Sequence, residues 1–169
     1  MNTVSKLVLV LLLLTATAAA QEPSTHHHDV KKVNIIDGSV HPEMVKDEDA
    51  YLLFLLSTIS KDGSDTERAR QLGIFAPLNL TGGQNNQLLE VLTEFAQKHN
   101  ALVQAYNTEA EKAGIAGTLP DFKAFRQNQN QLVAETRLKL ELVFGSVTAR
   151  RFHGFIQGEK RNMKIAVEE

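Results

Sequence analysis

One long helical segment limits the folds that the whole chain can adopt. Residues that are apolar, or that a packed seam tolerates, recur in it at steps of four and three positions. This spacing is close to the heptad pattern of a helix that packs along one seam. The seam consists of Leu88, Leu92, Phe95, His99, Leu102, Tyr106 and Ala110. We predict a helix over residues 82–113, about 48 Å long at roughly 1.5 Å per residue. Such a helix is too long for the middle of a compact globule and favours an elongated helical hairpin or bundle.

The start of this helix lies in the stretch NLTGGQNNQ, where two glycines follow a threonine. A phosphate-binding loop would need a preceding strand and a lysine after the glycines, and neither is present. Thr81 and Gln84 instead have the spacing of a capping box, in which each side chain bonds the backbone amide of the other residue. We therefore interpret Leu80, Thr81 and Gln84 as the start of the helix and Gly114 as its C-cap.

Two shorter helices are predicted before the long one. The first begins at Asp47, a good N-cap residue, and ends before Gly63. The second is capped by either Ser64 or Asp65 and closes near Pro77.

The C-terminal third of the chain is harder to assign. Thr118 as a cap and Pro120 at the first turn predict the next helix start. Residues 137–144, RLKLELVF, alternate leucines with charges as a strand would, but no partner strand is evident and leucine, lysine and glutamate favour helix. We expect a helix there, a break or bend at Gly145, and a last helix that ends near Ile165. The prediction is an all-α single domain of four to five helices over residues 34–165.

The first 20 residues have the composition of a cleaved signal peptide. Lys6 precedes an unbroken apolar run at residues 7–14, and alanines at residues 18–20 supply the small side chains of a cleavage site. The alternative, a membrane anchor, would need about 20 apolar residues. We expect a disordered polar leader at residues 21–33, a periplasmic or secreted bacterial location, and no transmembrane segment after signal cleavage. Because the chain has no cysteine, its stability has to come from an apolar core.

Charge and motifs argue against several classes of function. The chain carries 18 basic and 20 acidic residues, a net charge of −2 at pH 7. This balance gives no positive electrostatic potential that would attract nucleic acid. The chain contains neither a nucleophile elbow nor a spaced pair of metal-binding histidines. We therefore expect no enzyme activity and no cofactor. His26, His27 and His28 are weak candidates for a metal site, and an ordinary polar leader is the alternative interpretation.

Other polar residues admit structural interpretations. An acidic cluster lacks the frame of a calcium loop and is interpreted as helix capping; it consists of Glu43, Asp47, Glu48 and Asp49. His99 is interpreted as a core or interface histidine, and His153 has no spaced partner. The basic C-terminal segment, which includes Arg150 and Arg151, either binds an acidic partner or lipid headgroups, or is a solvated face that complements a helix dipole.

The pattern Leu80-Thr81-x-x-Gln84 at the start of a long amphipathic helix resembles the LTxxQ family of periplasmic proteins, which includes the Spy and CpxP stress proteins. Where a second copy of the motif would stand, residues 142–148 read LVFGSVT. The resemblance implies a flattened helical hairpin, a curved dimer, and ATP-independent binding of unfolded proteins on a concave face or sensing of envelope stress. The AYLLFL segment and the RFHGFIQGEKRNMKI end also resemble uncharacterised secreted bacterial helical proteins.

These observations lead to one main functional hypothesis and two rivals. The main hypothesis is an exported non-enzymatic protein that binds unfolded or partner polypeptides, in the manner of an ATP-independent envelope-stress chaperone. The rivals are a structural or adaptor bundle with one specific partner, and metal binding through the histidine leader. We expect a homodimer from the helical seam, and the expected partner-binding residues are Leu88, Phe95, Phe122, Phe125, Arg150 and Arg151.

Overall fold

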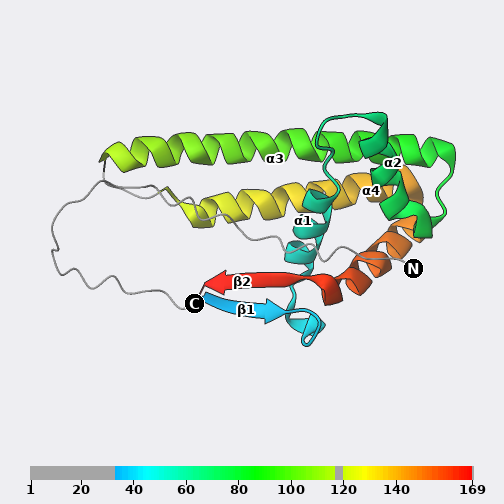
Figure 1. Ribbon diagram of the computed structural model, residues 1–169, viewed down its shortest axis with the longest axis horizontal. Helices are drawn as coiled ribbons and strands as arrows, with labels where there is room; N and C mark the ends of the chain where they lie inside the picture. Colours follow the sequence, from blue (N-terminus) through cyan, green and yellow to red (C-terminus); the bar gives the residue numbers. More distant parts are fainter. Residues whose placement is uncertain (1–32, 117–119, 169) are drawn as a thin grey trace.

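Two long helices lie side by side along the molecule and run in opposite directions (Figure 1). The computed structural model describes residues 33–116 and 120–168. The main elements in chain order are β1 (Val33–Asp37), α1 (Asp47–Ser57), α2 (Asp65–Phe75), α3 (Gly82–Ala116), α4 (Phe122–Glu159) and β2 (Lys164–Glu168). Short 3-10 turns occur at Pro42–Met44, Ala76–Leu78 and Lys160–Asn162. The predicted all-α class is confirmed: the described residues form four helices, where four to five were expected, and one small two-stranded sheet that was not predicted.

The start of α3 is the predicted capping box. The backbone N–H of Thr81 donates to the side-chain oxygen of Gln84 at 3.0 Å, and the N–H of Gln84 donates to the Thr81 hydroxyl at 3.3 Å. The predicted C-cap at Gly114 is wrong, because α3 continues to Ala116. Glycine is only about 1 kcal/mol worse than alanine in a helix interior, and good helix formers precede Gly114.

The N-cap of α4 is Asp121, whose carboxylate accepts from the N–H of Ala124 at 3.0 Å. The predicted cap Thr118 lies outside the described residues. Residues 137–144 are helical, as expected, and Gly145 interrupts the helix with a φ of 72° and a ψ of 163°. Only glycine adopts this region without strain, so the predicted bend is confirmed and has a backbone cause.

The end of the chain differs from the prediction. The last helix ends at Glu159 rather than near Ile165, and residues beyond it form β2. This strand pairs antiparallel with β1, so that Asp37 faces Lys164 and Val33 faces Glu168. Gly38 follows β1 and donates its N–H to the carbonyl of Met163 at 2.9 Å. A Cβ at position 38 would stand 1.9 Å from the Lys160 carbonyl oxygen, so this turn requires glycine.

The apolar core lies where α1 and α2 pack against α3 and the kinked part of α4 (Figure 1). Phe54 of α1 is its centre, with edge-to-face contacts to Phe75, Phe152 and Phe155 at centroid distances of 5.6, 6.0 and 5.5 Å. Phe75 and Phe152 also stack on each other at 5.8 Å. This aromatic cluster joins three helices, which explains why the first helix is so apolar.

Both short helices begin close to where they were predicted. Ser64 caps α2 and accepts from the N–H of Glu67 at 3.3 Å, as expected. The prediction that Asp47 is an N-cap is wrong, since Lys46 occupies that position and Asp47 is the first helical residue. Its carboxylate accepts instead from the ammonium of Lys160 at 2.6 Å, a partner 113 positions away that local sequence cannot indicate. Within residues 33–116 and 120–168, no helix has the length and apolar character needed to cross a membrane.

Candidate functional site

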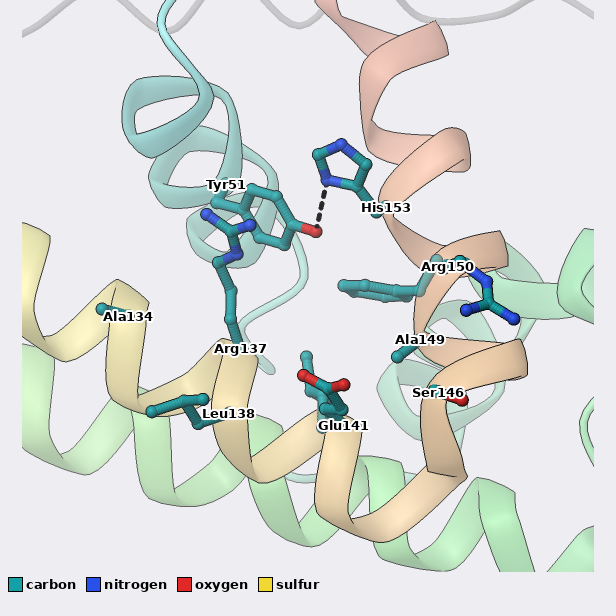
Figure 2. A pocket seen from close by; sticks show the side chains of 11 residues that line it. Tyr51, Ala134, Arg137, Leu138, Glu141, Ser146, Ala149, Arg150 and His153 are labelled. Carbon is teal, nitrogen blue, oxygen red and sulfur yellow. Dashed lines mark hydrogen bonds between the residues drawn. The ribbon is translucent and has the colours of Figure 1, made fainter.

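The bend at Gly145 makes an open cleft of about 450 Å³ between the two halves of α4. Figure 2 shows one half of the helix approaching the bend and the other leaving it, with Tyr51 of α1 across the opening. The first half contributes Ala134, Arg137, Leu138, Leu140 and Glu141, and the second contributes Ser146, Ala149, Arg150, Phe152 and His153. The residues on each side recur at helical three- and four-residue steps, so both halves direct one stripe toward the cleft.

Tyr51 and His153 form one wall of this cleft. The phenol oxygen lies 3.0 Å from Nδ1 of the imidazole, and the two rings stack with centroids 5.9 Å apart (Figure 2). Burial raises the pKa of Tyr51, although the nearby Arg137 guanidinium opposes part of that increase. The phenol is therefore protonated at neutral pH and stays a hydrogen-bonding group rather than a base.

Arg137 is held by the same tyrosine. Its guanidinium carbon lies 4.4 Å from the centroid of the Tyr51 ring, the geometry of a cation–π contact. Glu141 follows one turn later, where a carboxylate ordinarily pairs with an arginine. The two do not form an ion pair, and within the described part of the chain no carboxylate lies within 4.0 Å of Arg137 or Arg150. The cleft thus contains two arginines and one glutamate without charged partners in those residues.

An exposed apolar strip borders the cleft. Leu138 is 62% exposed and Leu142 is 86% exposed, whereas Leu140 between them is 2% exposed. Residues 138 and 142 share one helix face and residue 140 lies on the opposite face. The strand-like alternation of residues 137–144 therefore puts one leucine in the core and two in solvent.

A second polar arrangement links three helices away from the cleft. Arg126 of α4 contacts the carboxylate of Asp49 on α1 and donates to Gln129 at 3.2 Å. Gln129 in turn lies 3.1 Å from Nε2 of His99 on α3. Burial lowers the pKa of His99, so the buried ring is neutral near pH 7. This chain of contacts is consistent with the interpretation of His99 as a satisfied core histidine.

The structure does not bring the residues expected to bind partners together in one place. Leu88 and Phe95 are buried in the core and present no surface. Phe122 and Phe125 cluster with Tyr106 at the far end of the α3–α4 hairpin, where Phe122 is 45% exposed. Arg150 lines the cleft, while Arg151 is exposed and outside its lining.

The metal candidates His26, His27 and His28 lie outside the described residues. Within residues 33–116 and 120–168, no group of three or more histidine, aspartate or glutamate side chains is placed to hold a metal ion. The acidic residues interpreted as capping include Asp47 and Asp49, which form ion pairs with Lys160 and Arg126. Their carboxylates thus join helices in addition to lying at the positive end of α1.

Sequence reasoning missed most of the cleft, including the polar residues Tyr51, Arg137, Glu141 and His153. Tyr51 and His153 are 102 positions apart, so no local spacing could pair them. A signal for the cleft itself was present, because residues 134, 137, 138 and 141 before Gly145 have the same spacing pattern as residues 146, 149, 150 and 153 after it. When a helix bends at a glycine toward the side that carries such a stripe, the stripes before and after the glycine face each other.

None of the protein-family models, curated proteins or solved structures compared with the chain matches it. The geometry and charge of the cleft are therefore the basis for inferring what it does.

Proposed function

We propose that the protein is a non-enzymatic polypeptide-binding module that receives an apolar segment of a partner in the cleft at the bend of α4. The observation that carries this proposal is the pair of solvent-exposed leucines, Leu138 and Leu142, on the helix face beside the cleft. Covering a leucine side chain contributes about 1.5–3 kcal/mol, so two adjacent leucines favour an apolar partner. An amphipathic segment laid along a helix groove is a recurring mode of peptide recognition.

The distribution of apolar side chains favours an adaptor with one partner over a chaperone with a broad cradle. A cradle of the LTxxQ kind needs a large concave apolar face. Leu88 and Phe95, the expected contributors on the long helix, are 0% and 1% exposed. The exposed strip at Leu138 and Leu142 is narrow and suits one bound segment. The signal-peptide composition of residues 1–20 supports the cell envelope or the exterior as the place where binding occurs.

Binding to a fluorescently labelled, permanently unfolded polypeptide tests this proposal by anisotropy. The double variant Leu138→Ser/Leu142→Ser should weaken binding by more than about tenfold, given the area the two side chains can bury. Val40→Ser is the matched control, since Val40 is 65% exposed in the turn after β1 and does not line the cleft. It should bind as the unchanged protein does, and thermal melts should show all three proteins equally folded.

Three results would count against the proposal. Equal binding by the double variant and the control would place the polypeptide elsewhere on the surface. No binding to any of several unfolded polypeptides or helical peptides would remove the function altogether. If aggregation of many different clients were suppressed at near-stoichiometric ratios without ATP, as measured by light scattering, the broader chaperone function would replace the adaptor.

A further inference from the structure

We propose that Arg137 forms a carboxylate-recognition subsite in this cleft, to which Arg150 adds a second positive charge, so that the preferred partner segment carries an acidic side chain beside its apolar residues. This inference rests on the proposed polypeptide-binding function and specifies the chemistry of the partner. Its basis is that the charged side chains lining the cleft have no charged partners among the described residues.

Arg137 is half-buried and has no carboxylate partner in the described residues. Buried or half-buried charges are normally paired, and a guanidinium offers five N–H donors in a fork that matches a carboxylate. The ring of Tyr51 contacts one face of this guanidinium, and among the described residues no carboxylate pairs with the donors along its edge. An arginine held in place on an aromatic ring is ready to bind an anion with little loss of side-chain entropy.

Glu141 lies one helical turn from Arg137 and could compete for it, but the two form no ion pair. They are spaced by four residues on one helix, yet they form no ion pair because Arg137 lies over Tyr51 instead. Glu141 extends into the cleft between the two halves of α4 (Figure 2). A carboxylate brought by a partner would therefore meet Arg137 and would be repelled by Glu141.

Arg150 supplies the second positive charge, from the opposite side of the bend. It is a lining residue of the cleft, and in Figure 2 its guanidinium points away from Tyr51 and Arg137. The cleft side chains therefore carry two positive charges and one negative charge. That excess selects an acidic segment, and the exposed Leu138 one position after Arg137 selects an apolar residue next to the acid.

Three synthetic peptides test this subsite. Each has 16 residues and two leucines four positions apart, and each is acetylated at its N-terminus. The first carries glutamate next to a leucine and a C-terminal amide, the second carries glutamine there with the same amide, and the third carries glutamine with a free C-terminal carboxylate. The unchanged protein should bind the glutamate peptide about tenfold more tightly than the glutamine amide at low salt. The preference should shrink as salt rises.

Protein variants assign the preference to named groups. Arg137→Gln should remove the preference for the glutamate peptide. Arg137→Lys keeps a charge over Tyr51 but lacks the planar fork, so it should retain part of the preference. It also controls for a folding defect in Arg137→Gln. Glu141→Gln should enlarge the preference by removing the internal repulsion. Arg151→Gln is the matched control, because Arg151 is exposed but does not line the cleft, and it should leave the preference unchanged.

The outcomes separate this inference from the function on which it rests. Equal binding of both amidated peptides, lost in Leu138→Ser/Leu142→Ser, would keep polypeptide binding and overturn the carboxylate subsite. Preference for the free C-terminal carboxylate over the glutamate peptide would also overturn it, in favour of recognition of a chain end. If no peptide bound the unchanged protein, both the function and the subsite would be rejected.

Discussion

The two ends of the α3–α4 hairpin differ in how they are stabilised. At one end, which we call the base, α1 and α2 cover the helices and the aromatic cluster around Phe54 is buried. At the other end, which we call the arm, α3 beyond His99 and α4 before Gln129 pack mainly against each other, apart from Leu102 at the edge of the core and Arg126, which contacts Asp49 of α1. No described residue of the arm is buried, and its cluster of Tyr106, Phe122 and Phe125 is half-buried or exposed.

This contrast shows that helix length and core packing are separate properties of the chain. The apolar seam repeats along α3, but α1 and α2 cover only the first half of this helix. Two helices packed on each other alone are marginal in water, since tertiary burial supplies most helical stability. We therefore expect the arm to open locally at a lower free energy than the base.

Replacing Phe75 with alanine should have the largest effect, because it removes a ring from the centre of the base. Phe75 is 1% exposed and contacts both Phe54 and Phe152. We expect the free energy of unfolding to fall by about 3–5 kcal/mol, measured by urea denaturation. Phe122→Ala in the arm is the control and should lower it by less than about 1 kcal/mol. Similar losses in the two variants would mean that the arm is as well packed as the base.

Replacing Gly145 with alanine should have the next largest effect, through the backbone alone. A Cβ there would meet no atom within 4 Å, but the φ of 72° is strained for any other residue. The expected loss is about 1–3 kcal/mol, with weaker peptide binding because a straighter helix opens the cleft. Gly154→Ala lies on the same helix with ordinary backbone angles and equal space, and it should stabilise the protein by about 0.5–1 kcal/mol. Equal effects at the two positions would exclude the bend as a strained element.

The features that depend on neighbouring residues were predictable from the sequence. The capping box at Thr81 and Gln84, the cap at Ser64 and the bend at Gly145 each involve residues within a few positions of one another. The helix over residues 137–144 was also predictable, because the propensities of leucine, lysine and glutamate outweighed an alternating pattern that had no partner strand.

The features that join distant segments were not predictable in the same way. The strands β1 and β2 are short and come from opposite ends of the described chain, so neither has a neighbour in sequence that indicates a sheet. Asp47 was assigned a local capping role because its partner Lys160 is far away in sequence. The cleft depends on Tyr51 facing His153 across two helices, which requires the tertiary arrangement of α1 on α4. The exposure of Leu138 and Leu142 likewise follows from which face of α4 meets the core.

Replacing Phe125 with alanine should affect the arm more than the base. Phe125 is half-buried and lies 4.6 Å from Tyr106 by ring centroids, the closest ring pair of the arm cluster. The global free energy of unfolding should fall by about 1 kcal/mol. Hydrogen exchange should accelerate at residues 100–114 and 122–128 while amides of α1 and of α3 before His99 change little. Uniform acceleration throughout both helices would show that arm and base unfold as one unit.

Acidification should produce the smallest effect, at the boundary between base and arm. There Gln129 accepts from Arg126 through its oxygen, so its nitrogen faces and donates to Nε2 of His99. Nε2 must therefore be unprotonated, and a protonated ring would set two N–H groups against each other. Burial also lowers the pKa of His99 in the folded protein below its ordinary value of about 6.5.

The sign of the resulting pH dependence follows from proton binding. Between the lowered pKa of folded His99 and about pH 6.5, the unfolded chain binds more protons at this residue than the folded chain does. Stability from this group is therefore complete above about pH 6.5 and falls as the pH drops through that window. The pKa of the Asp47 carboxyl is lowered mainly by its hydrogen bond with Lys160, so its contribution is present above the ordinary aspartate pKa, about 4, and is lost only in stronger acid.

His99→Gln isolates the histidine contribution, because the amide oxygen of the new side chain can still accept from Gln129 but does not titrate near neutral pH. Urea denaturation at pH 7.5 and pH 5.5 should show a smaller loss of stability for His99→Gln than for the unchanged protein. The other histidines are common to both proteins, so the difference between the two losses belongs to position 99. Identical losses would mean that acid acts on another part of the chain. The contacts between His99, Gln129 and Arg126 would then hold the base to the arm without responding to pH.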